Sequence, residues 1–473
     1  MKSYSRIADI QSDIANKKTS CIHLVQSCLD AIEVHSNLNA FIDVWEKDAL
    51  EQASIIDTKI ANGSAGKLAG VVIAIKSNMC LEGKRVNASS KILDNFESLY
   101  TATAVQRLID EDAIIIGSSN CDEMAMGASS ENSAYGPVLN AANKAYVPGG
   151  SSGGSAVAVQ AGMCHAALGS DTGGSIRQPS AFTGTVGYKP SYGVVSRWGL
   201  LAYASSFDQI GPITRSAEDA ALLTGIMSGP DEKDATVSNK QWDLDLDRAP
   251  SKKKYAIIKE AMELEGLNAE VKNAFEKGIQ AIKDAGNEVE EISFPFLDYV
   301  VPTYYILTTA EASSNLSRYS GLTYGHRSEK AEDLESTFTL SRSEGFGKEV
   351  QRRIILGTFV LSSDYYDAYY KKGLQVRQLI RNWTVNAFEN YDAILSPTSA
   401  TPAFKIGEKA ANPIAMYLAD LLTAHANLAG NPAISIPMPK SEKGLPMGFQ
   451  IMGEMNKDQS LLSIAHQLEG LVK

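Results

Sequence analysis

The chain has 473 residues, of which 44% are hydrophobic and 21% charged, and its formal net charge at pH 7 is −11. This composition is that of a folded globular protein and excludes a disordered chain or a fibrous repeat. The densest run of basic residues is only Lys252–Lys254, so we expect no nucleic-acid-binding surface on this acidic chain itself.

Cysteine and histidine usage argues against a metal or disulfide framework. The five cysteines are an odd number, none of them pairs as C-x-x-C, and the six histidines are scattered. We therefore expect a reduced, cytoplasmic protein without a metal site. The N-terminal MKSYSRIADIQSDIANKK has no apolar signal-peptide core, and no window approaches the roughly 20 apolar residues of a membrane helix.

Residues 1–63 have the pattern of an N-terminal helical layer. Thr19–Ser20 can cap a helix whose apolar stripe is Ile22, Val25, Leu29 and Ile32. A second helix is predicted at Glu46–Ala61, and Asn62–Gly63 ends it. We expect this layer to be structural.

The hydrophobic period changes after residue 63. Gly70–Lys76 (GVVIAIK) and Ala113–Gly117 are continuous apolar runs, typical of strands buried on both faces, and Ala102–Asp112 predicts a helix between them. Such alternation indicates an α/β sheet with helices on both sides. We assign residues 64–220 to a catalytic core, in which the long aperiodic stretch 118–150 is expected to be a functional loop.

The rest of the chain continues this alternation. Residues 231–251 are polar and charged and predict a surface excursion, and 252–473 are expected to supply the remaining strands and the helices of a substrate pocket. Helices are predicted at Ser155–Gly162, Ser175–Phe182, Leu267–Ala285, Tyr304–Leu316, Glu349–Asn382 and Gln459–Leu471, and strands at Ala166–Leu168, Lys254–Lys259, Glu288–Ile292, Asp392–Ser396, Ala433–Pro437 and Met447–Met452. Because no repeat is visible and strands continue to the end, we favour one large α/β domain over residues 1–473.

Two glycine–serine clusters, Gly149–Ser155 and Gly173–Ser175, flank an apolar segment in the middle of the chain. A flexible linker is disfavoured because linkers are not flanked by sequences such as AVAVQAGMCHAALG. A P-loop would need Lys and Ser or Thr after its last glycine, whereas the first cluster continues as GGSAV. The triplet Asp171–Gly173 (DTG) occurs once, and an aspartic protease needs two such carboxylates.

The string GGSSG at Gly149–Gly153 also matches G-x-S-x-G, the nucleophile elbow of α/β-hydrolases. The preceding NKAYVP is not a convincing strand, and His165 lies in an apolar segment that favours a structural role. Lys76 is the other candidate base, because burial at the end of an apolar strand disfavours its charged form and lowers its pKa. A neutral lysine can take a proton from a serine. A solvated lysine at a strand end is the plain alternative.

Long ordered strings resemble the amidase signature family, namely GVVIAIKSNM and PGGSSGGSAVAVQAG…ALGSDTGGSIRQPSAFTGTVGYKPSYG…SFDQIGPITRSAEDAALL. The resemblance implies a single α/β domain with a mixed central sheet covered by helices on both faces. It also implies a Ser–cis-Ser–Lys triad, with Ser175 as the acylated nucleophile, Ser151 as the bridging serine in a cis peptide after Gly150, and Lys76 as the base.

Backbone N–H groups beside the nucleophile complete the predicted chemistry. The residues that precede Ser175 could form an oxyanion hole, in which each donor is worth about 3 kcal/mol. These residues are Thr172, Gly173 and Gly174.

Further strings resemble the branch of the family that hydrolyses glutamine within tRNA-dependent amidotransferases: SSNCDEMAMGASSENSAYGPVLN, TYYILTTAEASSNLSRYSGLTYGHR, GFGKEVQRRIILGTF, SSDYYDAYYKK, LSPTSATPAFKIGE, MYLADLLT and NLAGNPAISIP. This implies that free glutamine is hydrolysed to glutamate and ammonia, within a heterotrimer with B and C subunits. The ammonia then passes to a partner subunit that activates Glu-tRNA(Gln) with ATP. The resemblance places ATP, Mg²⁺ and most tRNA contacts on a partner chain, with no cofactor on this chain. The product implied is Gln-tRNA(Gln) or Asn-tRNA(Asn).

A pocket for free glutamine needs groups for its ammonium and its carboxylate. Arg353 and Asp420 match the family's residues for these roles, with Tyr304 nearby, and Arg can hold a carboxylate through two parallel hydrogen bonds. We expect Asp420 to lie within a helix among apolar residues, where an unpaired charge would be costly. A structural ion pair between the two stays open, as does a shift of one residue to the neighbours Arg352 and Tyr305.

The chain departs from the family pattern around the proposed base and after Gln178–Pro179. The family usually has proline and aspartate where this chain has Val72 and Ser77, and both replacements could alter how Lys76 is held. Ser180 and Thr183 also replace commoner residues. Two alternatives stay open: a stand-alone amidase for a small amide, and a non-catalytic scaffold, which the presence of all three triad residues argues against.

Overall fold

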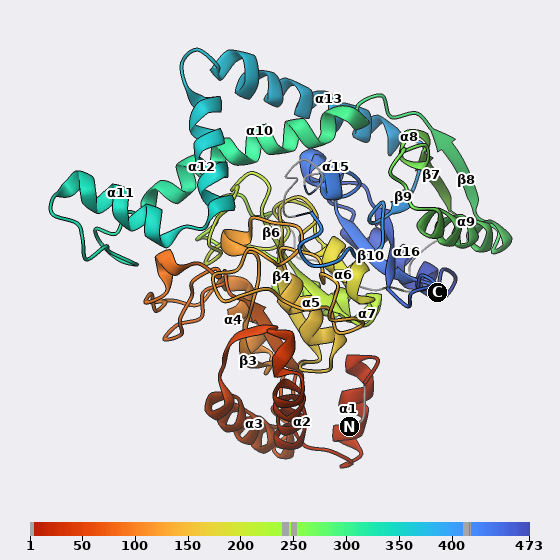
Figure 1. Cartoon of the computed structure of the whole chain (residues 1–473). Helices are drawn as coiled ribbons and strands as arrows, with labels where there is room; N and C mark the ends of the chain where they lie inside the picture. Colours follow the sequence, from red (N-terminus) through yellow and green to blue (C-terminus); the bar gives the residue numbers. More distant parts are fainter. Residues whose placement is uncertain (1–3, 239–245, 247–252, 410–415, 417) are drawn as a thin grey trace.

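A computed structural model describes residues 4–238, 246, 253–409, 416 and 418–473 (Figure 1). All eleven strands of these residues belong to one mixed sheet, in the order β1-β3-β2-β4-β6-β5-β10-β11-β9-β7-β8. The strands are β1 (Phe41–Val44), β2 (Val72–Lys76), β3 (Ile114–Ser119), β4 (Ala166–Asp171), β5 (Val186–Lys189), β6 (Gln209–Thr214), β7 (Lys254–Ile258), β8 (Glu288–Ile292), β9 (Ala393–Pro397), β10 (Ala433–Met438) and β11 (Met447–Met452). The predicted α/β fold with one mixed sheet is confirmed.

Helices cover this sheet and extend beyond it. They are α1 (Ile7–Ala15), α2 (Cys21–Val34), α3 (Glu46–Ala61), α4 (Thr103–Asp110), α5 (Gly153–Gln160), α6 (Arg177–Thr183), α7 (Ala217–Met227), α8 (Lys259–Met262), α9 (Ala269–Asp284), α10 (Leu297–Asn315), α11 (Leu334–Gly345), α12 (Lys348–Leu361), α13 (Lys372–Ala387), α15 (Ala424–Ala429) and α16 (Asp458–Glu469). In Figure 1, α1–α3 form a layer at the N-terminal end, and α10, α12 and α13 form a second layer at the opposite end.

Strand β2 is buried on both faces, as its continuous apolar sequence predicted. Val72 and Ala74 pack in a core with residues of α2, α3 and α5, whereas Ile73 and Ile75 pack in a second core with residues of α4 and α7. Alternate side chains point to opposite faces of a strand, so this division follows from the period of two. The strand ends at Lys76, whose whole side chain is therefore enclosed.

The order of the strands brings the central segments of the sequence together. β2 pairs in parallel with both β3 and β4, and the register sets Ile75 beside Leu168. The carboxyl ends of β2 and β4, at Lys76 and Asp171, consequently lie at the same edge of the sheet. This edge is where open α/β sheets place their ligand sites.

Several predicted elements need correction. Helix α10 begins at Leu297 rather than Tyr304, and it includes Pro302 within the helix, at the cost of one backbone hydrogen bond. The single helix predicted at Glu349–Asn382 is two helices, α12 and α13, joined by the π-helical segment η6 (Tyr366–Lys371). Ile22, predicted in the apolar stripe of α2, is exposed, while Ser20 caps the helix as predicted.

Some elements had no counterpart in the prediction. These are α7, α8, α11, α15 and the strands β1, β5 and β6. Strand β1 lies within residues 1–63, which were expected to be a helical layer, whereas α1 agrees with that expectation. The predicted polar excursion at 231–251 falls mainly on residues outside the described part of the chain.

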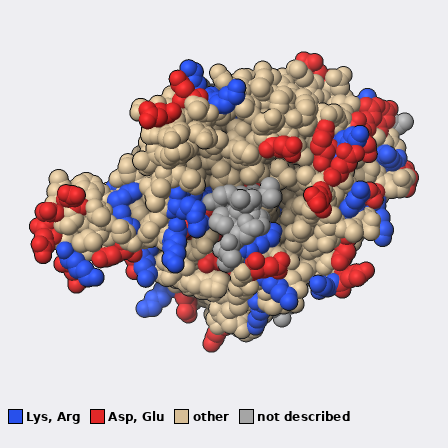
Figure 2. Space-filling model, turned by 45° about the horizontal axis from the view of Figure 1, so that its top comes forward, with Lys and Arg blue, Asp and Glu red and all other residues tan. Residues whose placement is uncertain are grey.

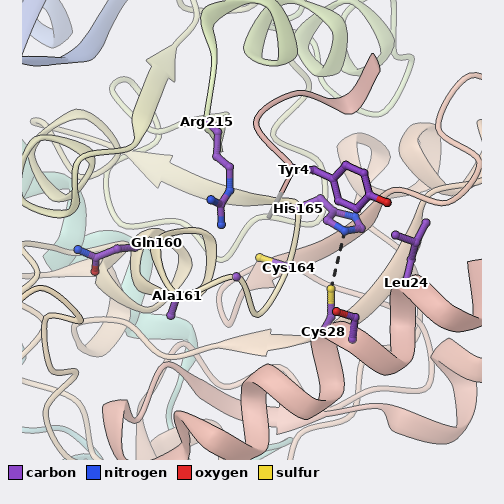
Figure 3. Close-up of a pocket in the computed structure, with 10 residues that line it drawn as sticks. Tyr4, Leu24, Cys28, Gln160, Ala161, Cys164, His165 and Arg215 are labelled. Carbon is purple, nitrogen blue, oxygen red and sulfur yellow. Dashed lines mark hydrogen bonds between the residues drawn. The ribbon is translucent and has the colours of Figure 1, made fainter. Parts of the chain in front are cut away.

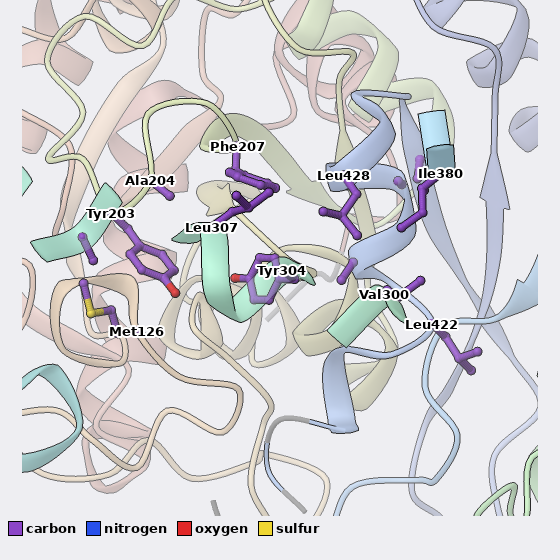
Figure 4. Packing of buried hydrophobic residues seen from close by; sticks show 14 of the residues in the cluster. Met126, Tyr203, Ala204, Phe207, Val300, Tyr304, Leu307, Ile380, Leu422 and Leu428 are labelled. Atoms are coloured by element: carbon purple, nitrogen blue, oxygen red, sulfur yellow. The ribbon is translucent and has the colours of Figure 1, made fainter. Parts of the chain in front are cut away.

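The layer of α10, α12 and α13 covers a large apolar core above the carboxyl edge of the sheet. Gly357 of α12 lies so close to α10 that a Cβ there would approach the Thr309 carbonyl oxygen to 1.9 Å. Figure 4 shows how Tyr304 from this layer packs beside Phe207 and near Tyr203. The helical layer thus brings aromatic side chains against the segments that follow β4 and precede β6.

Candidate active site

Lys76 lies at the centre of a ring of hydroxyl groups. Its side chain is fully buried, and Nζ lies 2.7 Å from Ser151 Oγ, 3.0 Å from Ser152 Oγ and 2.9 Å from Ser170 Oγ. Burial lowers the pKa of Lys76, with neighbouring carboxylates opposing the change. All three contacts are neutral groups, so this lysine has surroundings in which its uncharged, proton-accepting form is favoured.

Ser151 follows the Gly150–Ser151 peptide bond, which is cis. The backbone here is held tightly, because Gly150 N–H donates to Gln178 Oε1 at 2.9 Å and Asp122 N–H donates to the Ser151 carbonyl at 3.2 Å. A Cβ on Gly150 would lie 2.1 Å from Asp122 Oδ2, so only glycine fits.

Asp122 organises the long loop that the sequence marked as functional. Its carboxylate accepts hydrogen bonds from the backbone N–H groups of Ser129, Ser130 and Asn132. Burial raises the pKa of Asp122, while these N–H groups oppose the rise. The loop between residues 118 and 150 therefore packs against the Gly150–Ser151 segment.

The second glycine–serine cluster is anchored by a buried ion pair. Asp171 and Arg177 are both fully enclosed, and the Arg177 guanidinium contacts both carboxylate oxygens of Asp171. The remaining guanidinium hydrogen bonds go to the Thr423 carbonyl, Gln450 Oε1 and Asn427 Oδ1. Although burial favours the neutral acid, the Arg177 charge holds the pKa of Asp171 down at about 2. Sequence reasoning missed this pair.

The turn at 172–175 has close neighbours on both sides. A Cβ on Gly173 would lie 2.6 Å from the Tyr304 hydroxyl oxygen, and a Cβ on Gly174, which has φ = +142°, would lie 2.2 Å from Thr423 Oγ1. Gly174 N–H donates to Asp171 Oδ1 at 2.9 Å, so it is engaged in holding the turn. Among the described residues, the N–H groups of Thr172, Gly173 and Ser175 have no hydrogen-bond partner.

Ser175 lies at the end of this turn and is 8% exposed. Its carbonyl accepts a hydrogen bond from Ser152 N–H at 3.1 Å, which joins the two glycine–serine clusters. Within the described part of the chain, its hydroxyl forms no hydrogen bond. The Ser152–Ser175 hydrogen bond thus places Ser175 in the same region as Ser151 and Lys76.

Arg353 lies on the inner face of α12 and is 3% exposed. Its guanidinium donates to Glu349 Oε1 and to the Tyr203 hydroxyl, both at 2.9 Å, and lies 5.2 Å from the centre of the Tyr305 ring. The neighbouring Arg352 is exposed and contacts only Glu349 among the described ion pairs. Of the two adjacent arginines, Arg353 is the one that faces the interior.

Asp420 lies opposite Arg353 across a tyrosine. Tyr305 donates its hydroxyl hydrogen to Asp420 Oδ2 at 2.9 Å, so Tyr305 contacts both charged residues. Burial raises the pKa of Asp420 to about 7, although the Tyr305 hydrogen bond and the Arg353 charge oppose this. The expectation of a mid-helix position was wrong: Asp420 ends a short 3-10 turn, Leu418–Asp420, and a turn at 421–423 separates it from α15.

Tyr304 and Tyr305 both belong to this region and have different neighbours. Tyr304 packs against Gly173 and Phe207, whereas Tyr305 contacts Asp420. Tyr203, which the sequence did not single out, accepts from Arg353 and donates to Thr308. No periodic signal marked Tyr203, because it lies in the irregular stretch before β6.

Competing interpretations of the sequence fail on geometry. His165 Nδ1 accepts a hydrogen bond from Val72 N–H at 3.0 Å, and the ring lies against Tyr4 and Cys28 (Figure 3). Burial lowers the pKa of His165 to about 3, so it is a neutral structural side chain. The pocket that it lines, with Arg215, lies between helix α2 of the N-terminal layer and the segment that joins α5 to β4.

Val72 and Ser77, which depart from the family pattern near Lys76, both have hydrogen-bond partners. Valine supplies the N–H at position 72 that His165 accepts, which proline could not do. Ser77 Oγ lies 3.1 Å from Ser89 Oγ and 3.3 Å from Cys121 Sγ, so a small neutral cluster occupies the space beyond Lys76.

The described ranges hold neither a metal-binding cluster nor a membrane-spanning helix. No three His, Cys, Asp or Glu side chains there come together in a way that could hold a metal ion. No described helix combines the length and apolar character that crossing a membrane requires.

Comparison with known proteins identifies relatives over nearly the whole chain. The A subunit of glutamyl-tRNA(Gln) amidotransferase from Chlorobium limicola is 47% identical over 470 residues, covering 98% of this chain and 99% of that protein. Its counterpart from Alkaliphilus metalliredigens is 48% identical, covering 98% and 95%. The crystal structure of the corresponding A subunit from Thermotoga maritima has a TM-score of 0.78 at 40% identity, covering 94% and 92%. The family model described as Amidase matches residues 23–462, and the chain therefore belongs to the amidase family.

Proposed function

We propose that this chain is the glutamine-hydrolysing subunit of a tRNA-dependent amidotransferase. Three observations support the proposal. They are a buried lysine ringed by serine hydroxyls, a turn before Ser175 with unpaired N–H groups, and a buried arginine and aspartate, Arg353 and Asp420, that both contact Tyr305. The full-length relatives near 47% identity carry the name of such a subunit. The single observation that carries most weight is the Lys76–Ser151 contact of 2.7 Å, because it supplies a base.

Acylation begins with neutral Lys76. Ser175 Oγ attacks the side-chain amide carbon of glutamine, and its proton passes to Ser151 Oγ as the Ser151 proton passes to Lys76 Nζ. The developing oxyanion lies against the N–H groups of Thr172 and Gly173, with Gly174 holding the turn. The same relay then returns a proton to the amide nitrogen, and ammonia leaves.

Deacylation repeats these steps with water. A water molecule attacks the ester carbonyl of acylated Ser175 and gives its proton to the Ser151–Lys76 relay. Collapse of the intermediate returns this proton to Ser175 and releases glutamate. The sum is glutamine and water converted to glutamate and ammonia, and no metal or redox group is required on this chain.

Recognition of free glutamine uses the opposite side of the site. Asp420 as a carboxylate would bind the substrate ammonium, and Arg353 would bind the α-carboxylate through parallel hydrogen bonds. Tyr304 lies against Gly173, in the turn that leads to the proposed nucleophile. A zwitterionic substrate would place an ammonium beside Asp420 and a carboxylate beside Arg353, which favours glutamine over an uncharged amide.

We further propose that the chain works in the cytoplasm within a heterotrimer with B and C subunits. ATP and Mg²⁺ would bind at the partner that activates Glu-tRNA(Gln) or Asp-tRNA(Asn), and tRNA would contact mainly that partner. The acidic net charge of −11 fits a chain that leaves RNA binding to another subunit.

The test compares substrates and variants. Ammonia release should be much faster from glutamine than from propionamide, which lacks both charged groups, and Ser175→Ala should abolish it. In a complex with the partner subunits, Ser175→Ala should still transamidate with added free ammonia but not with glutamine. Equal hydrolysis of glutamine and propionamide, without any need for a partner, would instead favour a stand-alone amidase.

A further inference from the structure

One exposed surface plays no part in the proposed chemistry. The aromatic ridge consists of Phe359 at the end of α12 and three tyrosines that follow it, Tyr365, Tyr366 and Tyr369, each between 40% and 42% exposed. The three tyrosines belong to the stretch LSSDYYDAYYKK, a motif that has no role in the proposed triad or glutamine pocket. Exposed aromatic groups at this density on a protein surface indicate a binding surface.

The ridge is a preorganised surface rather than a set of loose side chains. The ring centres of Phe359 and Tyr365 are 4.2 Å apart, and Tyr369 lies 5.8 Å from Phe359 and 6.0 Å from Tyr365. Tyr366 packs on Tyr370, at 5.3 Å, and Tyr370 in turn packs against the core. Rigid aromatic groups lose little conformational entropy on binding, which is why they dominate interface energies.

Aliphatic side chains enlarge this surface. Ile355, Leu356 and Leu361 of α12 are 68%, 40% and 36% exposed, and every residue from 361 to 369 is exposed. The charged residues in that interval are Asp364 and Asp367. Figure 2, in which the top of the molecule is turned forward, shows a broad uncharged area with charged groups gathered mainly around it.

The ridge lies on the outer side of the wall of the glutamine pocket. Helix α12 carries Arg353 on its inner face, and Gly357 brings it into close backbone contact with α10, which carries Tyr304. The π-helical segment η6 also packs against α10, α12 and α13. A protein bound to the ridge would therefore rest on the elements that line the pocket.

We propose that the aromatic ridge docks the partner subunit that receives the ammonia. This inference rests on the proposed function, since ammonia reaches an acceptor without loss only if that acceptor adjoins the pocket wall. Tyrosine suits such a contact because its ring is buried while its hydroxyl stays at a polar rim. A lipid surface fits less well, because residues 361–372 carry two aspartates beside two lysines and no arginine, which is not the basic cluster that anionic lipids attract. A second copy of the chain fits less well, because it would cover the outer side of the pocket wall without accepting ammonia.

The experiment measures binding of the B and C subunits to the full chain by titration, with two separate ridge variants, Tyr369→Arg and Phe359→Asp. Each variant should raise the dissociation constant at least tenfold. Tyr299→Arg is the matched control, because Tyr299 is a 56% exposed tyrosine at the other end of α10, and it should bind within twofold of the wild type. Melting temperature and glutamine hydrolysis by the chain alone should be unchanged in all three.

The outcomes separate this inference from the function beneath it. If the wild-type chain binds the partners but both ridge variants bind equally well, the docking surface lies elsewhere and the inference is wrong. If the wild-type chain neither binds them nor hydrolyses glutamine, the proposed function fails first. Sedimentation that shows a dimer of this chain, lost in Tyr369→Arg, would make the ridge a contact between copies and contradict the proposal.

Discussion

The two sides of the candidate site are built in opposite ways. On the nucleophile side, Lys76, Ser151 and Asp171 belong to strand ends and loops inside the sheet, and hydroxyls, backbone groups or a paired guanidinium surround them. On the substrate side, Arg353 and Asp420 come from a helix and a 3-10 turn, and tyrosine rings separate them. The first side is fixed in position and uses neutral surroundings to make a base. The second buries an acid and an arginine on either side of a tyrosine ring.

The largest expected effect is on the nucleophile side. Lys76→Arg keeps the charge but cannot lose its proton, so kcat/KM for glutamine should fall by about 10³-fold. In the wild type, activity should decline as pH falls through the lowered pKa of Lys76, because the ammonium form cannot accept a proton. If the variant keeps its activity and shows the same decline of activity at low pH as the wild type, Lys76 is not the base. Unchanged thermal unfolding serves as the control for folding.

The buried ion pair beneath the turn should matter mainly for stability. Asp171→Asn leaves the Arg177 charge without its partner, so the free energy of unfolding should drop by about 3–5 kcal/mol in urea titration. Asp9→Asn, which breaks the exposed Arg6–Asp9 pair, is the matched control and should cost less than about 1 kcal/mol. Because the pKa of Asp171 is lowered to about 2, its stabilisation is complete above the unfolded value and lost as pH falls toward 2.

On the substrate side, the effects should appear in binding. Arg353→Lys keeps the charge but loses the planar fork, so KM for glutamine should rise by about tenfold to a hundredfold with a smaller change in kcat. Arg352→Lys is the control one residue away, where the side chain is exposed and KM should stay within twofold. Equal effects of the two changes would mean that the arginine contribution is long-range charge rather than contact.

The smallest expected effect is a pH dependence. The pKa of Asp420 is raised to about 7, so in the empty site it is largely neutral below that pH and a carboxylate above it. A carboxylate is needed to bind the substrate ammonium, so KM should rise several-fold as pH falls from 8 to 6. In Asp420→Asn this dependence should vanish and KM should be uniformly high. A wild-type KM that is flat over this range would place the ammonium elsewhere.

Much of the nucleophile side could be predicted from the sequence, and less of the substrate side. The apolar run that ends at Lys76 indicated burial, and burial alone lowers the pKa of a lysine. The glycines at 150, 173 and 174 indicated close approach, which the structure shows against Asp122, Tyr304 and Thr423. The Asp171–Arg177 pair was missed because DTG suggested a different chemistry and nothing local marks an ion pair.

The sequence by itself determined the strands buried on both faces, the cap of α2 and the glycine positions, because these depend on local period, hydrogen bonding and steric room. Only the tertiary structure decided which arginine faces the interior and that Asp420 ends a 3-10 turn. It also decided that one predicted helix is two helices joined by a π-helical segment. Those features depend on contacts between segments that lie a hundred or more residues apart, such as Tyr305 with Asp420 and Arg353 with Tyr203. No periodic pattern along the chain encodes such contacts, since each partner looks ordinary until the fold brings the other beside it.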